Sequence, residues 1–197
     1  MKNEKESTKE KILFASLEFI EKNGINAITV RKIAEIADVN VAAINYHFGS
    51  KEELLQKALE FSMYQAYRDP IIAIKEKKFN VYQALHFLLH DWFEGMINYP
   101  GISRAQLFEP FVNNNYESLF VKKFNTFLED FITKLKENGE VFDEQDLRLS
   151  LVQIISAIIL PGIMPQLFSN FFKKDLKIME NREEYFNHLL SKYVKEI

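Results

Sequence analysis

The sequence predicts an all-α protein, on three observations. Apolar residues recur at helical spacing, beginning with Leu13, Leu17 and Ile20, which is the pattern of a helix with one buried face. Two capping boxes, Ser7–Glu10 and Ser50–Glu53, mark helix starts, because the serine accepts a backbone hydrogen bond and the glutamate reaches back. No segment alternates apolar and polar residues as a half-buried strand does. We therefore expect helices along the whole chain.

Residues 1–50 are predicted to form three helices. The first ends at Asn23-Gly24, since glycine accepts the left-handed conformation in which many helices stop. Thr29 is the expected N-cap of the second helix. Asp38-Val39-Asn40 makes the turn to the third, and aspartate tolerates a left-handed backbone better than most residues do. Asparagine at the end of this turn caps the third helix, which Gly49 closes.

Residues 51–197 are predicted to hold the longer helices. The helix that begins at the second capping box is expected to stop at Asp69-Pro70, where aspartate would cap a new segment with proline at its first position. Pro161 and Pro165 are expected to break a later helix midway. The other expected helices are Val81–Asn98 capped by Asn80, Ile102–Val112, Tyr116–Asn138, one beginning at Asp143 and one beginning at Asn181.

Composition limits the class of protein. The 197 residues include no cysteine, which excludes disulfides, thiolate metal sites and cysteine nucleophiles. The charged N-terminus lacks the apolar core of a secretory signal, so a cytoplasmic protein is expected. The net charge is −3, and residues 1–50 carry seven Lys/Arg against seven Asp/Glu. Affinity for a polyanion would therefore require positive charge gathered on one face. Arg31, Lys32, His47 and Lys51 are the candidates for that face.

The third expected helix, from Val41 to His47, suits a DNA major groove. Its side chains and those just after it are small residues, one amide, and then hydroxyl, imidazole and ammonium donors: Ala42, Ala43, Asn45, Tyr46, His47 and Lys51. Small side chains let a backbone approach base edges, and the donors reach phosphates. Ordinary packing at a helix end is the alternative for Tyr46-His47-Phe48, and we expect it to hold for Phe48.

An ordered series of short matches extends from the first helix to the start of the fourth. It comprises Lys11–Gly24, Ile28–Arg31, Ile33-Ala34, Tyr46–Phe48 and Ser50–Leu54. The series resembles the helix-turn-helix of the tetracycline-repressor (TetR) family of bacterial transcriptional regulators. The resemblance implies a DNA-binding domain over residues 1–50 and a helical effector-binding and dimerisation domain over residues 51–197. The second region resembles the family only in its helical character and length.

The resemblance also implies roles for single residues and two partners, double-stranded operator DNA and a second copy of the chain. It assigns four residues to phosphates: Thr29, Tyr46, His47 and Lys51. Five candidates remain for base edges: Arg31, Val41, Ala42, Ala43 and Asn45. An asparagine at such a position can read adenine through a paired donor and acceptor. In a family dimer, Asp143–Leu160 and Arg182–Lys195 would pair with their symmetry mates in a four-helix bundle.

A repressor released from its operator by an apolar or aromatic small molecule is the expected function. The 18 phenylalanines and the single tryptophan supply most candidates for lining an effector cavity. The candidates are Tyr64, His86, His90, Trp92, Phe93, Phe108, Phe111, Phe124 and Phe127. For each of them ordinary core packing is the alternative. His86 and His90 lie four residues apart, as zinc ligands often do, but no third ligand follows from the spacing, and we expect no metal or cofactor.

Three other interpretations follow from the sequence. Residues 149–172 contain no charge, which allows a membrane span by length, but interspersed polar residues and prolines favour a buried helix. Catalysis is not expected, because no nucleophile with a paired base and no glycine-rich phosphate loop occurs. The stronger rival is a TetR-like structural or cell-division factor that binds DNA without an effector.

Overall fold

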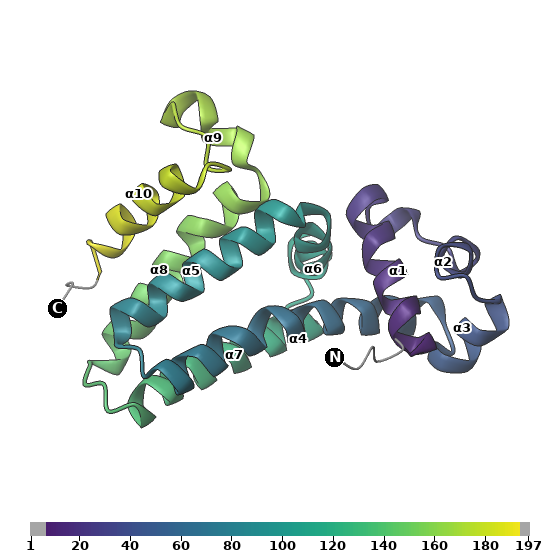
Figure 1. Cartoon of the computed structure of the whole chain (residues 1–197), viewed down its shortest axis with the longest axis horizontal. Helices are drawn as coiled ribbons and strands as arrows, with labels where there is room; N and C mark the ends of the chain where they lie inside the picture. Colours follow the sequence, from purple (N-terminus) through teal and green to yellow (C-terminus); the bar gives the residue numbers. More distant parts are fainter. Residues whose placement is uncertain (1–6, 194–197) are drawn as a thin grey trace, which may run out of the picture. The chain divides into compact units, whose positions relative to one another are not determined.

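Figure 1 presents a computed structural model of the chain, which describes residues 7–193. These residues form α-helices joined by turns and contain no β-strand, which confirms the all-α class. The elements are α1 (Thr8–Asn23), the short 3-10 helix η1 (Ile25–Ala27), α2 (Val30–Ile36), α3 (Val41–Phe48), α4 (Lys51–Lys77), α5 (Val81–Asn98), α6 (Pro100–Val112), α7 (Leu119–Glu137), α8 (Glu144–Ile163), α9 (Pro165–Phe172) and α10 (Met179–Leu190).

The chain folds into two compact units, and each is described by itself. The first, here called the head, comprises the chain up to Gln65 together with Gly101–Lys123. The second, here called the body, comprises Ala66–Pro100 and the chain from Phe124 onward. The boundaries between the units therefore fall inside α4, α6 and α7. The functional boundary expected after residue 50 stays a prediction, since packing divides the chain at other positions.

Hydrogen bonds between near neighbours begin the helices of the head. The Ser7 hydroxyl accepts from the backbone N–H of Glu10 at 3.2 Å, and the Glu10 carboxylate accepts from the backbone N–H of Ser7 at 2.9 Å. The expected capping box is therefore confirmed. Beneath these caps, α1 to α4 share a core of aliphatic and phenylalanine side chains that includes Ile20, Ile33 and Ile44.

A helix from later in the sequence, α6, completes the head. A Cβ atom added at Gly101 would lie 2.5 Å from the backbone oxygen of Glu21 in α1, so no larger residue fits there without movement of the backbone. The Glu21 carboxylate accepts a hydrogen bond from the Ile102 N–H at 2.9 Å. This N–H lies in the first turn of α6, and N–H groups of a first turn have no carbonyl acceptor within their own helix. Ala105 is buried in the same core as α1. The start of α6 is thus held directly on α1.

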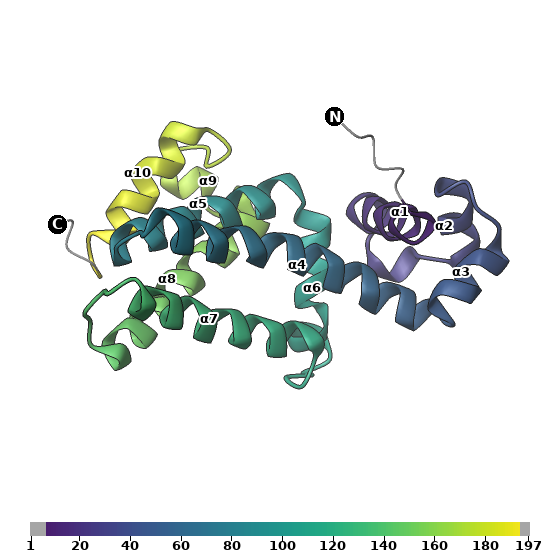
Figure 2. The same cartoon turned by 60° about the horizontal axis from the view of Figure 1, so that its bottom comes forward.

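The body is built around α5 and α8. The helix α5 packs against both α8 and α10, and Figure 2 shows it between them. Three phenylalanines, Phe93, Phe131 and Phe186, are fully buried in its core, and the rings of Phe93 and Phe186 meet edge to face at 5.3 Å. Asn80 caps α5 and Asp143 caps α8, as the sequence predicts.

The helix break expected at Pro70 was wrong, and the later break falls at Met164, directly before Pro165, rather than at Pro161. The helix α4 continues through Pro70 to Lys77, and α8 continues through Pro161 to Ile163. Proline costs a helix interior about 3 kcal/mol, which apolar burial can offset. Pro70 and Pro161 are themselves buried, and Ile74, one turn beyond Pro70, is fully buried in the body's core. Packing therefore outweighs the local preference to break.

A polar stripe joins α5 to α10 along the outside of the body. On α5 it consists of residues spaced by four: Tyr82, His86, His90 and Glu94. Their partners on α10 run in the opposite direction: Asn187 accepts from the Tyr82 hydroxyl at 3.1 Å, Glu183 lies 3.0 Å from the His86 Nε2 and 3.9 Å from the His90 Nε2, and Arg182 pairs with Glu94. Of these, Arg182 is the buried member, only 5% exposed.

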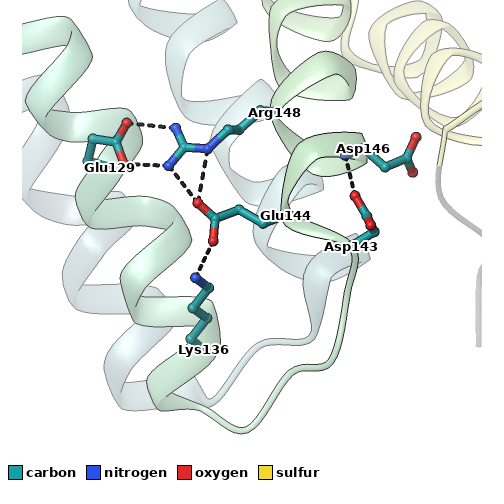
Figure 3. A network of polar contacts seen from close by, with 6 residues as sticks. All are labelled: Glu129, Lys136, Asp143, Glu144, Asp146 and Arg148. Atoms are coloured by element: carbon teal, nitrogen blue, oxygen red, sulfur yellow. Dashed lines mark hydrogen bonds and ion pairs between the residues drawn. The ribbon is translucent and has the colours of Figure 1, made fainter.

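An exposed charged network joins α7 to α8 (Figure 3). The Arg148 guanidinium donates to both carboxylate oxygens of Glu129, at 2.6 and 2.7 Å, and to Glu144 at 2.7 Å, while Lys136 also donates to Glu144. Hydrogen bonding from Arg148 lowers the pKa of Glu129, and hydrogen bonding from Lys136 and then Arg148 lowers the pKa of Glu144. Both carboxylates therefore stay ionised to lower pH than free glutamate.

One helix, α8, is long and apolar enough to cross a membrane by length and composition alone, with a mean hydropathy of 1.6 in its most apolar window. Its inner residues Leu147, Leu151, Ile154 and Ile158 are buried in the body's core. A core helix of a soluble protein has the same properties, so this helix is weak evidence for a membrane span.

Candidate DNA-binding interface and effector region

The turn between α2 and α3 adopts the backbone that the sequence predicts. Asp38 has a φ of 53°, in the left-handed region, and the Val39 N–H donates to the Ala34 carbonyl at 3.0 Å. The Asn40 carboxamide oxygen then accepts from the Ala43 N–H at 2.7 Å and begins α3. The two helices are thus joined by a tight turn with both ends hydrogen-bonded.

Two buried side chains, Ile44 and Phe48, fix the inner face of α3 on the head's core. Residues on the other faces remain available to a partner. Tyr46 is 86% exposed, and Val41, Ala42 and Asn45 are exposed as well, while Ala43 is half-buried. Phe48 therefore packs inward, as expected, whereas Tyr46 does not.

The candidates for phosphate contacts lie at two helix ends of the head. Thr29 caps α2, and its hydroxyl oxygen accepts from the Lys32 N–H at 3.3 Å, which leaves the hydroxyl proton for another acceptor. Tyr46, His47 and Lys51 gather where α3 ends and α4 begins, with the Tyr46 and His47 rings 5.2 Å apart. These side chains are donors or cations, and Arg31 adds an exposed cation on α2.

In α3 the inner face is buried, a tight turn precedes the helix, and hydrogen-bond donors lie at its end. This is the arrangement of a helix-turn-helix protein that binds DNA and regulates transcription. Residues 12–58 match the family of bacterial regulatory proteins described as the tetR family. The matched residues therefore carry a DNA-binding domain of the tetR-family type, and the chain is a DNA-binding transcriptional regulator, not an enzyme.

Similar proteins extend the likeness beyond the head. The chain is 27% identical to the probable HTH-type transcriptional regulator YttP of Bacillus subtilis (strain 168), over 97% of this chain and 92% of that protein. Its fold is similar to FadR from Bacillus subtilis, crystallised with stearoyl-CoA, with a TM-score of 0.64, 23% identity and coverage of 95% and 98% of the two chains. A TetR transcriptional regulator from Legionella pneumophila gives a TM-score of 0.65, 20% identity and coverage of 97% and 100%.

The nine candidate effector residues fall in both units. Tyr64, Phe108 and Phe111 belong to the head; Tyr64 and Phe111 are 59% and 71% exposed, and Phe108 is half-buried. The other six, His86, His90, Trp92, Phe93, Phe124 and Phe127, belong to the body. Phe93 lies in the core against Phe186, and the two histidines belong to the polar stripe.

Three of the body's candidates form one aromatic cluster. The Trp92 ring lies 5.0 Å from that of Phe127 and 5.6 Å from that of Phe124. Tyr67 completes the cluster, at 4.9 Å from Phe127 and 5.7 Å from Trp92, and burial raises the pKa of its phenol. The Trp92 Nε1 is buried and has no hydrogen-bond partner in the described part of the chain. An acceptor from outside the protein would satisfy it.

A hollow of about 370 Å³ opens elsewhere on the body. It lies between the start of α5, the turn between α7 and α8, and the start of α8, and Tyr82, Phe142 and Tyr193 are its aromatic walls. None of the nine candidates lines it. The assignment of those candidates to an effector stays a prediction.

Two features were missing from the sequence interpretation. Tyr67 was not among the candidates, although it shares a helical face with the buried Ile74 seven residues later; that spacing was the available signal. The contact of Glu21 with Gly101 and Ile102 was also missed. No local pattern in the sequence indicates it, because the partners lie about eighty residues apart.

Proposed function

We propose that this regulator is a cytoplasmic homodimeric repressor that leaves its operator when an apolar or aromatic small molecule binds. The observation that carries the DNA-binding part is α3, whose buried Ile44 and Phe48 support the exposed Asn45 and Tyr46. The acidic balance of the whole chain is no obstacle, since phosphates are neutralised only by nearby cations.

Contacts to phosphates are assigned to Thr29, Tyr46, His47 and Lys51, and contacts to base edges to Arg31, Val41, Ala42, Ala43 and Asn45. The free proton of the Thr29 hydroxyl and the exposure of Tyr46 support their share of this assignment. Asn45 is exposed on the same helix, and its amide can pair with adenine.

Binding titrations at several salt concentrations test these roles. Lys51→Ala should weaken binding to operator and scrambled duplexes alike and reduce the salt slope by about 1 for each phosphate that the lysine no longer neutralises. Tyr46→Phe should also weaken binding to both duplexes but leave the salt slope unchanged, because the hydroxyl that it removes is neutral. Asn45→Ala should instead cost roughly 1–3 kcal/mol at one base position per half-site. An unchanged salt slope for Lys51→Ala would refute its phosphate role.

The effector part of the proposal is supported by the aromatic cluster around Trp92. Its buried, unpartnered indole N–H favours a ligand with a hydrogen-bond acceptor attached to an apolar or aromatic group. Such a ligand weakens DNA binding only if it prefers one of two conformations of the protein. FadR, with its bound stearoyl-CoA, is an example of a similar fold that holds a partly apolar ligand.

Tryptophan fluorescence tests the effector, since Trp92 is the single tryptophan of the chain. Titration with acyl-CoA thioesters and with aromatic carboxylates should quench or shift the emission, and the same compounds should release operator DNA. Trp92→Phe removes both the indole N–H and the tryptophan emission, so this variant is compared with the wild type by release of operator DNA alone. Release of DNA by none of these compounds, together with unchanged fluorescence, would favour the alternative of a DNA-binding structural factor without an effector.

Dimerisation is assigned to the segments Asp143–Leu160 and Arg182–Lys195, of which residues 194 and 195 lie outside the described residues. Two heads must reach half-sites about 34–36 Å apart, and a stable pair should bury more than roughly 2,000 Å². Sedimentation equilibrium should find a dimer at micromolar concentration, and a monomer would contradict the proposal.

A further inference from the structure

The helix α9, Pro165–Phe172, displays an apolar stripe that its own chain does not cover. Its members Leu167, Phe168 and Phe171 lie within about one helical turn of one another, on one face, and Met164, which directly precedes the helix, is grouped with them. All four are exposed, and Phe171 is 89% exposed. These four residues are called the α9 stripe.

The other side chains of α9 are also poorly buried. None of its described side chains is buried, and Phe172 is half-buried against the Tyr185 ring at 5.8 Å. A helix of eight residues is marginal in water without tertiary packing. Covering a side chain such as phenylalanine is a large source of stability, so α9 would gain most of its stability from a partner.

The α9 stripe continues a longer uncharged surface. Residues 149–172 carry no charge, and Leu149, Val152 and Leu160 are exposed on α8. Figure 1 shows α9 following directly from the end of α8, and the two helices pack together. Contiguous exposed apolar surface of this extent marks an interaction site.

The other helix of the expected interface contributes little apolar area. The exposed residues of α10 are mostly polar, namely Glu180, Glu184, Asn187 and His188, and Met179 is the exposed apolar one. The core of a stable homodimer interface is apolar and poor in charge. Without the α9 stripe, an interface made from α8 and α10 would have few large apolar side chains at its centre.

The charges beside the α9 stripe do not favour a membrane as its partner. Residues 173–184 carry four Lys/Arg and four Asp/Glu, a balance of zero, and Lys174 pairs with Glu184. Binding of a short amphipathic helix to anionic lipid relies on a surplus of basic residues. A protein surface of matching apolar character fits better.

We propose that the α9 stripe is covered by a second copy of this chain, so that α9 enlarges the interface formed by α8 and α10. This inference rests on the homodimer of the proposed function. In a two-fold pair each side chain of the stripe occurs twice, so a change at two positions removes four apolar side chains from the interface.

Sedimentation equilibrium of the full chain tests the inference with the double variant Leu167→Ser/Phe171→Ser. Its dimer dissociation constant should rise by about a hundredfold or more, because four large side chains lose their burial. The matched control is Val141→Ser in the same unit, at a residue 97% exposed outside the stripe, which should leave the constant unchanged. Circular dichroism verifies that both variants are folded.

The outcomes separate the two proposals. If the wild-type chain is a monomer at micromolar concentration, the homodimer itself fails and this inference fails with it. If the double variant dimerises like the wild type while Leu149→Ser/Val152→Ser weakens the dimer, only the role of α9 is overturned. Co-sedimentation with phosphatidylglycerol vesicles that the double variant loses, without a change in dimerisation, would assign the stripe to a membrane and overturn the inference.

A second measurement covers the case of a poorly folded double variant. Because the chain has no cysteine, Phe171→Cys carries one thiol for a polarity-sensitive fluorophore. The emission should be blue-shifted in the dimer and move to the red on dilution into monomers. A label that reports water at dimer concentrations would overturn the inference.

Discussion

Around α2 and α3 in the head the side-chain hydrogen bonds are local, whereas the body combines such local caps with polar pairs between distant residues. In the head, the caps Ser7–Glu10, Thr29–Lys32 and Asn40–Ala43 join residues three apart. In the body, Glu94 pairs with Arg182 across 88 residues and Tyr82 with Asn187 across 105. The difference indicates that the two units are stabilised in different ways. The head fixes the geometry of α3 locally, whereas the arrangement of helices in the body depends on a few distant contacts and aromatic rings that a ligand could change.

Breaking the buried ion pair of the body should have the largest effect. Glu94→Ala leaves the Arg182 guanidinium, 5% exposed, without its carboxylate, and should lower the free energy of unfolding by about 3 kcal/mol. Glu18→Ala in the head is the matched control, since Glu18 pairs with Lys22 on the surface and should cost less than about 1 kcal/mol. Urea unfolding measures both, and equal losses would contradict the contrast between the units.

Two glycine-to-alanine changes should have opposite signs. Gly101→Ala forces a methyl group to within 2.5 Å of the Glu21 backbone oxygen and should destabilise the head by about 2 kcal/mol. Gly95→Ala in α5 of the body meets no atom within 4 Å and should stabilise by about 0.5–1 kcal/mol through helix propensity. Thermal unfolding of the two variants compares them directly; destabilisation by Gly95→Ala would show that the body is packed more tightly there.

Residues with a left-handed backbone allow a further comparison of the two units, with a smaller expected change in stability. Asp38 in the head and Lys78 in the body have φ values of 53° and 50°, a conformation that aspartate tolerates better than lysine. Lys78→Gly should therefore stabilise by about 1 kcal/mol and Asp38→Gly by about half as much. Denaturant midpoints of the single variants decide the order, and a larger gain at Asp38 would contradict it.

The charged network between α7 and α8 should give the smallest effect, seen as a pH dependence. Because hydrogen bonds lower the folded-state pKa of Glu129 and Glu144 below 4.5, their stabilisation is fully present above that pH and is lost as the pH falls through the folded values. Arg148→Met should flatten this acid limb of the stability curve as the pH falls below about 5. An unchanged limb would mean that solvent screens the network completely.

Most of the head was predictable from sequence, because its signals are local. The caps at Ser7, Thr29 and Asn40 and the left-handed Asp38 each depend on a few adjacent residues. Local signals in the body succeeded equally: α5 begins and ends at Val81 and Asn98 as predicted, and Asp143 caps α8.

The features that could not be predicted from the sequence depend on tertiary packing. The breaks expected at Pro70 and Pro161 were wrong because buried apolar side chains outweigh the local cost of proline. The pairing of His86 and His90 with Glu183 could not be predicted, since no sequence pattern indicates which face of α5 meets α10. For the residues that the resemblance assigns to DNA, the structure gives the exposure, and their contacts with DNA stay predictions.

The contact between Gly101 and Glu21 bears on how regulators of this kind could exchange parts. A chimera that grafts residues 1–50 onto a foreign effector domain would separate Glu21 from the Ile102 N–H and set it against an unrelated residue at the Gly101 position. In this chain the segment Gly101–Lys123 packs as part of the head. Recombination that keeps a working head should therefore transfer both segments together, or keep glycine at the start of the recipient's sixth helix.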